Sequence, residues 1–130
     1  FASGLRWLLA PAIRKEETAL AENLASVFKE NQDVALRRIV IFSNGMYNRP
    51  KGPNKISFYR VLRDPQFLDQ SNYETLDKSI SSFEEFPDLR SAQITWYIPP
   101  PPGRHFRAAG KYWEHVMADL AKSPRVEVIY

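Results

Sequence analysis

The fold is decided by residues 89–130, LRSAQITWYIPPPPGRHFRAAGKYWEHVMADLAKSPRVEVIY. Apolar side chains on one side predict a strand over 89–98, at Ala92, Ile94, Trp96 and Ile98. A helix is predicted over 106–122, where Phe106, Gly110, Trp113, Met117 and Leu120 share one stripe. A second strand is predicted over 125–130. Strand, crossover helix and strand form a βαβ unit, in which the two strands are parallel.

Earlier segments extend this pattern toward the N-terminus. A helix is expected over 12–30, where apolar residues recur near the 3.6-residue period after Pro11. The strand expected over 34–42 contains the unbroken apolar run IVIF at 39–42, which predicts burial on both faces and a central position. A second strand is expected over 56–62, a short helical turn from Asp64-Pro65 to Leu68, and a helix over 71–83.

These elements predict an α/β fold, with α+β as the alternative, in one domain over residues 1–130. We expect a mixed sheet of about four strands packed by three helices, with the βαβ unit at the C-terminal end. Three irregular segments complete the organisation: an N-terminal arm at 1–11, a protruding basic loop or hairpin tip at 44–55, and a proline-rich connector at 99–104.

Composition excludes several kinds of chemistry. The absence of cysteine removes disulfides, thiolate metal sites and cysteine nucleophiles, and the longest apolar runs are too short for a transmembrane segment. His105 and His115 stand ten residues apart, a spacing that matches no metal motif, so we expect one loop histidine and one on a helix surface. Paired carboxylates fit solvated helix faces, and no nucleophile elbow is present. The sequence predicts no enzyme, no metal and no cofactor. A hydrolase or transferase is the remaining alternative, and it would need a pocket that gathers His105 or His115 with a carboxylate.

Charge is the strongest indication of a partner. Residues 34–63 contain seven lysines and arginines and no acidic residue. Such a stretch attracts polyanions, and its composition resembles that of the basic loops with which ribosomal proteins contact RNA. We expect Arg49, Lys51 and Lys55 to bind phosphate, and Tyr47 to stack on a base or anchor the loop. Arg60 and Arg63 complete the predicted RNA-binding set. A solvated loop, or one that docks on an acidic protein, is the alternative.

A proline run predicts a second contact surface. Four consecutive prolines form an extended left-handed helix that aromatic grooves recognise, although such a segment also serves as a stiff connector. The predicted partner-binding residues are Trp96, Tyr97, Pro99, Pro100, Pro101, Pro102 and Arg104, with Trp113 as a further exposed aromatic residue.

The basic loop and the proline run together indicate a role in binding RNA or other proteins. We expect a non-catalytic structural subunit of a large assembly, in the first instance a mitochondrial ribosomal protein that contacts ribosomal RNA through its basic loop. The alternative is a scaffold subunit of a mitochondrial respiratory complex, or an adaptor that binds other protein subunits through the proline run. Residues 1–15 carry three basic residues and no acid, which favours the mitochondrial matrix over the cytoplasm.

Overall fold

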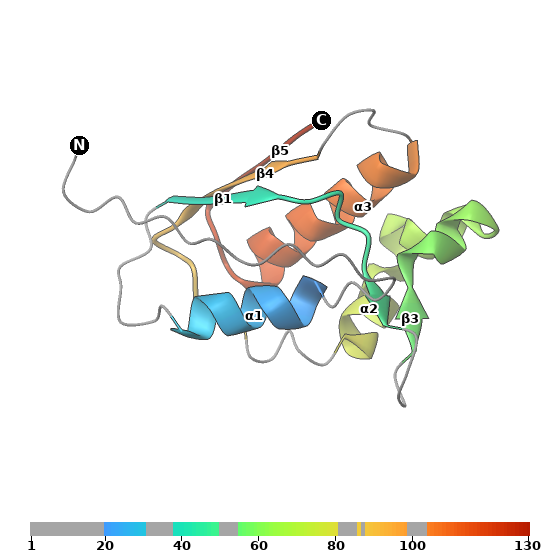
Figure 1. Ribbon diagram of the computed structural model, residues 1–130, viewed down its shortest axis with the longest axis horizontal. Coiled ribbons are helices and arrows are strands. Elements are labelled where there is room, and N and C mark those ends of the chain that lie inside the picture. Colours follow the sequence, from blue (N-terminus) through green and yellow to red (C-terminus); the bar gives the residue numbers. More distant parts are fainter. Residues whose placement is uncertain (1–19, 31–37, 50–54, 81–85, 87, 99–103) are drawn as a thin grey trace.

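The computed structural model describes residues 20–30, 38–49, 55–80, 86, 88–98 and 104–130 (Figure 1). Its strands are β1 (Arg38–Phe42), β2 (Asn48–Arg49), β3 (Ile56–Ser57), β4 (Gln93–Tyr97) and β5 (Arg125–Ile129). The described α-helices are α1 (Leu20–Glu30), α2 (Tyr73–Ser79) and α3 (Arg104–His115). A π-helical turn, η5 (Val116–Leu120), continues α3, and the 3-10 helices η1 (Phe58–Leu62), η2 (Pro65–Leu68) and η3 (Gln70–Asn72) lie between β3 and α2.

The main sheet is parallel and carries the βαβ unit. β1, β4 and β5 pair in the order β1-β4-β5, with both pairings parallel. The predicted α/β class and the C-terminal βαβ unit, formed by β4, α3 and β5, are therefore confirmed. In place of the predicted mixed sheet of about four strands, the described residues form a three-stranded parallel sheet and a separate antiparallel pair, β2 and β3.

The position predicted for β1 is wrong. In the sheet that the structure describes, β1 is an edge strand and β4 is the central one. Ile39 and Ile41 face the core, whereas Val40 and Phe42 are exposed. An apolar run fits a doubly buried strand, but it also fits an edge strand that carries apolar residues on its open face, and periodicity alone does not separate the two.

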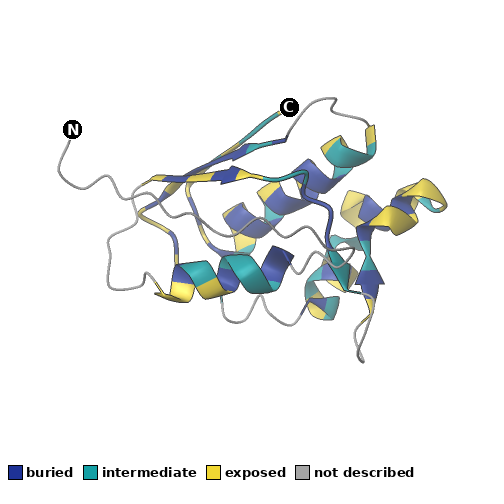
Figure 2. Ribbon diagram, in the orientation of Figure 1, coloured by how far each residue is buried: buried dark blue, intermediate teal, exposed yellow. Residues whose placement is uncertain are grey.

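The core lies between the sheet and α3, and it is rich in aromatic rings. Figure 2 shows buried residues along β4 and α3. The indole of Trp96 stacks on that of Trp113, with ring centroids 5.4 Å apart. Both rings are fully buried, so the expectation that they are exposed contact residues is wrong. Each ring instead buries apolar surface in the core and provides one indole N–H hydrogen-bond donor.

Those two indole donors fix the segment that leads from the sheet to the β2–β3 hairpin. Trp96 Nε1 donates to the carbonyl of Ser43 at 2.9 Å, and Trp113 Nε1 donates to that of Gly45 at 2.7 Å. Gly45 has a φ of +74°, a conformation that suits glycine because it lacks a Cβ. Of the two forms expected for residues 44–55, a long loop or a hairpin tip, the antiparallel pairing of β2 with β3 agrees with the hairpin, and the segment before β2 is anchored to the core.

Several predicted ends of secondary-structure elements differ from those in the structure. The strand predicted over 56–62 ends at Ser57, because Phe58 and Val61 turn inward three residues apart, the spacing of a 3-10 turn. Pro65 begins η2 as predicted. The helix predicted over 71–83 is shorter than expected, because α2 ends at Ser79 and Ile80 has left the helical conformation. Parts of other expected segments lie outside the described residues: the arm at 1–11, the start of the first helix at 12–19 and the strand start at 34–37.

Candidate nucleic-acid interface

The seven basic residues of the acid-free interval separate in space. Arg37 and Lys51 lie outside the described residues. Arg38 begins β1 and Arg49 belongs to β2. The remaining three line one open groove, which we call the basic groove, and they are Lys55, Arg60 and Arg63.

The basic groove has a volume of about 710 Å³ and is formed by β3, the 3-10 helices and α2. Its lining combines a cationic rim with an apolar floor, to which Ile56, Phe67 and Leu76 contribute. Hydrogen-bonding side chains also line it, and they include Asn48, Ser71, Asn72 and Ser79. Cations, amides and hydroxyls are the groups that proteins place against phosphate and sugar oxygens.

The groove carries excess positive charge. Lys55 and Arg63 are exposed, and no carboxylate in the described part of the chain forms an ion pair with either of them. Arg60 lies 3.7 Å from Asp64, but both side chains are exposed, so the pair contributes little. The guanidinium of Arg60 also lies over the ring of Phe67, at 5.2 Å from its centroid. Three cations against one carboxylate leave a surface that attracts anions.

A local turn at η3 shapes the part of the groove wall that contains Ser71 and Asn72. The carboxylate of Asp69 accepts hydrogen bonds from the backbone N–H and hydroxyl of Ser71, and these bonds hold the pKa of Asp69 below its usual value. Asn72 donates from its side chain to the carbonyl of Phe67 at 2.8 Å. The polar wall therefore has a defined backbone conformation, which positions its side chains before any ligand binds.

Two residues of the predicted RNA-binding set lie elsewhere. Tyr47 is fully buried and its hydroxyl donates to Glu22, so the expectation that its ring stacks on a base is wrong. Burial is the largest cause of the strong upward shift in its pKa, followed by the bond to Glu22. Arg49 pairs with the same carboxylate at 3.3 Å and does not line the groove. Because α1 supplies this carboxylate, Tyr47 and Arg49 join the hairpin to α1.

Little of the predicted partner-binding surface remains accessible in the described residues. Trp96 is buried, which corrects its assignment as a contact residue, and Pro99 to Pro102 lie outside the described residues. Arg104 is exposed at the start of α3. Tyr97 is half-buried because its ring stacks on Phe42, with centroids 5.2 Å apart and planes inclined at 14°. Phe42 was not predicted as a contact residue, and its only signal is its place at the end of an apolar run.

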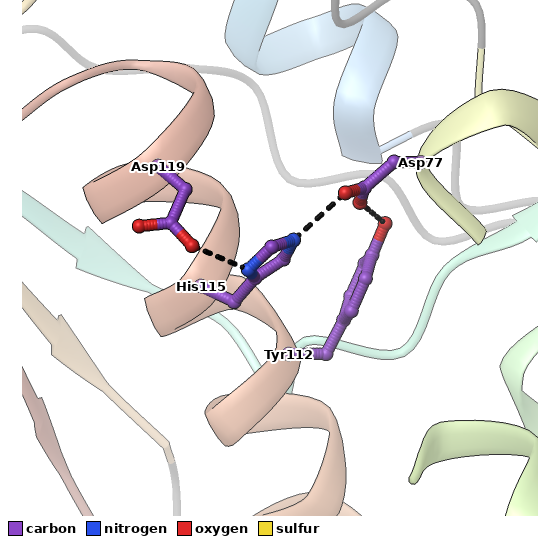
Figure 3. Close-up of polar contacts among 4 residues, drawn as sticks. All are labelled: Asp77, Tyr112, His115 and Asp119. Carbon is purple, nitrogen blue, oxygen red and sulfur yellow. Dashed lines mark hydrogen bonds and ion pairs between the residues drawn. The ribbon is translucent and has the colours of Figure 1, made fainter. Parts of the chain in front are cut away.

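A polar cluster that the sequence did not predict joins α2 to α3 (Figure 3). His115 Nε2 lies 2.8 Å from Asp77 Oδ2, and its Nδ1 lies 2.9 Å from Asp119 Oδ2. Tyr112 donates to the other oxygen of Asp77 at 2.8 Å, and burial is the main reason that its pKa is raised far above the usual value. The expected helix-surface histidine is thus largely buried, and both ring nitrogens are hydrogen-bonded.

This cluster is an interhelical clamp rather than a ligand site. The ring of Tyr73 packs against that of His115, with centroids 4.9 Å apart. With both imidazole nitrogens held by carboxylates, neither is open to take a proton from a substrate. Within residues that the structure describes, no group of three or more histidines or carboxylates is arranged to hold a metal ion.

Comparison of the chain with models of known families, with curated proteins and with solved structures gave no significant match. Across the described ranges, no helix has the length and apolar character needed to cross a membrane.

Proposed function

We propose that this chain is a non-catalytic structural subunit of a ribonucleoprotein assembly and that its basic groove binds RNA phosphates. The observation that carries the proposal is the convergence of Lys55, Arg60 and Arg63 on one groove, two of them without an ion pair in the described residues. Phosphates are the polyanionic groups that such a rim attracts, and neighbouring amide and hydroxyl groups suit sugar and phosphate oxygens.

The form of the groove favours a folded RNA over a small anion. Its volume of about 710 Å³ exceeds what a single phosphate fills, and it is open to solvent rather than enclosed. The mitochondrial ribosome is the setting that we propose, because residues 1–15 are basic and the interval 34–63 has the composition of an RNA-contacting loop. A structural role agrees with a histidine whose two ring nitrogens are both held by carboxylates.

The test is the binding of a structured RNA hairpin across a potassium chloride titration. Three phosphate contacts predict a slope of about −2 to −3 in a plot of log affinity against log salt concentration. The variant Lys55→Ala/Arg63→Ala should lower the magnitude of this slope by about two, one for each cation removed, and should weaken binding at low salt.

A matched variant controls for net charge. Lys29→Ala/Lys111→Ala also removes two exposed lysines, which lie on α1 and α3 outside the lining of the basic groove. It should leave the slope nearly unchanged. The proposal fails if the two double variants weaken binding equally, because binding would then depend on net charge and not on the cations of the basic groove. It also fails if the unmodified chain does not bind RNA at low salt.

A further inference from the structure

The face of the main sheet that points away from α3 presents three rows of side chains. The parallel pairing is in register, so residues opposite one another on β1, β4 and β5 share a row. The row at the carboxyl end of the strands is apolar and consists of Phe42, Tyr97 and Ile129. At the amino end it is Arg38, Gln93 and Arg125. The face therefore has an apolar end and a basic end.

The outermost side chain at the apolar end of this face is Phe42, whose aromatic ring is exposed. Phe42 stands on β1, an edge strand in the part of the sheet that the structure describes, and Tyr97 stacks on it from the central strand. The two rings are nearly parallel, at 14°, so Tyr97 covers one face of the Phe42 ring. Phe42 is nevertheless 75% exposed. A third flat ring can thus extend the stack on its outer side.

The size of this apolar area decides between two kinds of partner. A phenylalanine presents roughly 200 Å² at most, so the exposed part of Phe42 amounts to roughly 150 Å². Val40 adds a smaller area, since it is 41% exposed. Tyr97 and Ile129 on the same face are only partly exposed, and a stable protein interface needs roughly 800 Å² on each partner, well above what these side chains offer together. One nucleobase, by contrast, needs a single aromatic face.

The charge on the face agrees with a nucleic acid. Arg38 lies four residues before Phe42 on the same strand, which corresponds to about 13 Å along it, a distance that a few nucleotides span. Arg125 occupies the same row two strands away. Among the strand residues that the structure describes, the carboxylate on this face is that of Glu127, on the opposite edge strand from Phe42. Basic side chains beside an exposed aromatic ring are the combination with which sheet surfaces hold single-stranded RNA.

We infer that Phe42 is a stacking platform for an unpaired RNA base, with Arg38 binding the backbone of the same strand. This inference rests on the proposed RNA-binding function and deepens it, because it adds a second site with a preference for single-stranded segments. The basic groove would hold phosphates of any folded RNA, and the sheet face would select a segment whose bases are free to stack.

The experiment compares two RNA probes and two aromatic substitutions. The probes are a short single-stranded oligonucleotide that carries 2-aminopurine, whose fluorescence falls when it stacks, and a blunt duplex of the same length. Phe42→Leu keeps an apolar side chain on the strand but removes the ring. Tyr59→Leu is the matched control, because it removes another exposed ring, from η1, that lies away from this face.

We expect Phe42→Leu to weaken binding of the single strand by about tenfold or more, in line with one lost stacking contact, and to abolish the quenching. Binding of the duplex and the salt slope should not change, and Tyr59→Leu should behave as the unmodified chain. Equal losses in both variants, or unchanged single-strand binding and quenching in Phe42→Leu, would overturn the stacking site. Duplex binding that depends on Lys55 and Arg63 would then leave the proposed function intact, so the two failures are distinguishable.

Discussion

Replacement of His115 by phenylalanine tests whether the clamp between α2 and α3 stabilises the fold. Phenylalanine keeps a flat ring against Tyr73 and Tyr112, so the packing seen around the imidazole is largely retained. The substitution removes both hydrogen bonds of the ring, to Asp77 and to Asp119. Asp77 then keeps only its bond from Tyr112 among those described for this cluster.

The expected cost follows from the exposure of the two carboxylates. The side chain of Asp77 is 20% exposed, and a hydrogen bond to a charged group at such a site contributes about 1.5–3 kcal/mol. Asp119 is 67% exposed and lies four residues along the same helical segment, so its bond contributes only about 0.3–0.5 kcal/mol. His115→Phe should therefore lower the free energy of unfolding by about 2–3 kcal/mol.

The assay is urea unfolding followed by the fluorescence of the three tryptophans, supported by thermal unfolding. The melting temperature should fall by roughly 6–12 °C in a chain of this size. Asp119→Asn is the control and should cost less than about 0.5 kcal/mol. A double-mutant cycle of His115→Phe with Asp77→Asn should give a coupling energy of about 1–2 kcal/mol. A cost below about 0.5 kcal/mol for His115→Phe, or no coupling, would refute the clamp.

Two further substitutions probe the hairpin anchor and the buried tyrosines. Gly45→Ala should lower the free energy of unfolding by about 1–3 kcal/mol, because alanine is strained at a φ of +74° and its Cβ would lie 3.1 Å from Trp113 Cδ1; an unchanged urea midpoint would contradict this. The pKa of Tyr112 is raised, so the folded chain keeps a proton that the unfolded chain loses above about pH 10. The contribution of Tyr112 to the free energy of unfolding should thus be fully present below about pH 10. Above that pH the free energy of unfolding should fall by up to about 1.4 kcal/mol per pH unit for each such tyrosine. Tyr112→Phe should make that alkaline fall shallower, and an equally steep fall in the variant would contradict the assignment.

The sequence predicted the C-terminal half of the fold well for a physical reason. The helix after the proline run has a clear apolar stripe, and the strands on either side of it leave the chain no way to bury that stripe except by a parallel crossover. The same reasoning failed for β1 and for 56–62. Burial at Phe58 and Val61 follows a 3-10 turn, whose short period a loosely alternating strand pattern imitates.

Charge located the candidate site more reliably than side-chain type did. An interval without acidic residues identified Lys55, Arg60 and Arg63, which line one groove. The aromatic residues were assigned less well, because Tyr47 and Trp96 are as suited to a core as to a contact surface, and only packing decides between the two. The contact of His115 with Asp77 spans 38 positions in the chain, so no local pattern could indicate it.

The bonds from Trp96 and Trp113 to Ser43 and Gly45 have a consequence for the order of events during synthesis. They join residues 53 and 68 positions apart, so the segment that carries the hairpin acquires its anchors only after Trp96 and Trp113 have been made. Domains generally fold as units during synthesis, once the residues that complete their core are available. Here the basic residues are translated early, yet their arrangement around the groove depends on a helix made late. A nascent chain that stops before Trp113 would carry these charges without the hydrogen bond to Gly45 that holds the start of the hairpin in place.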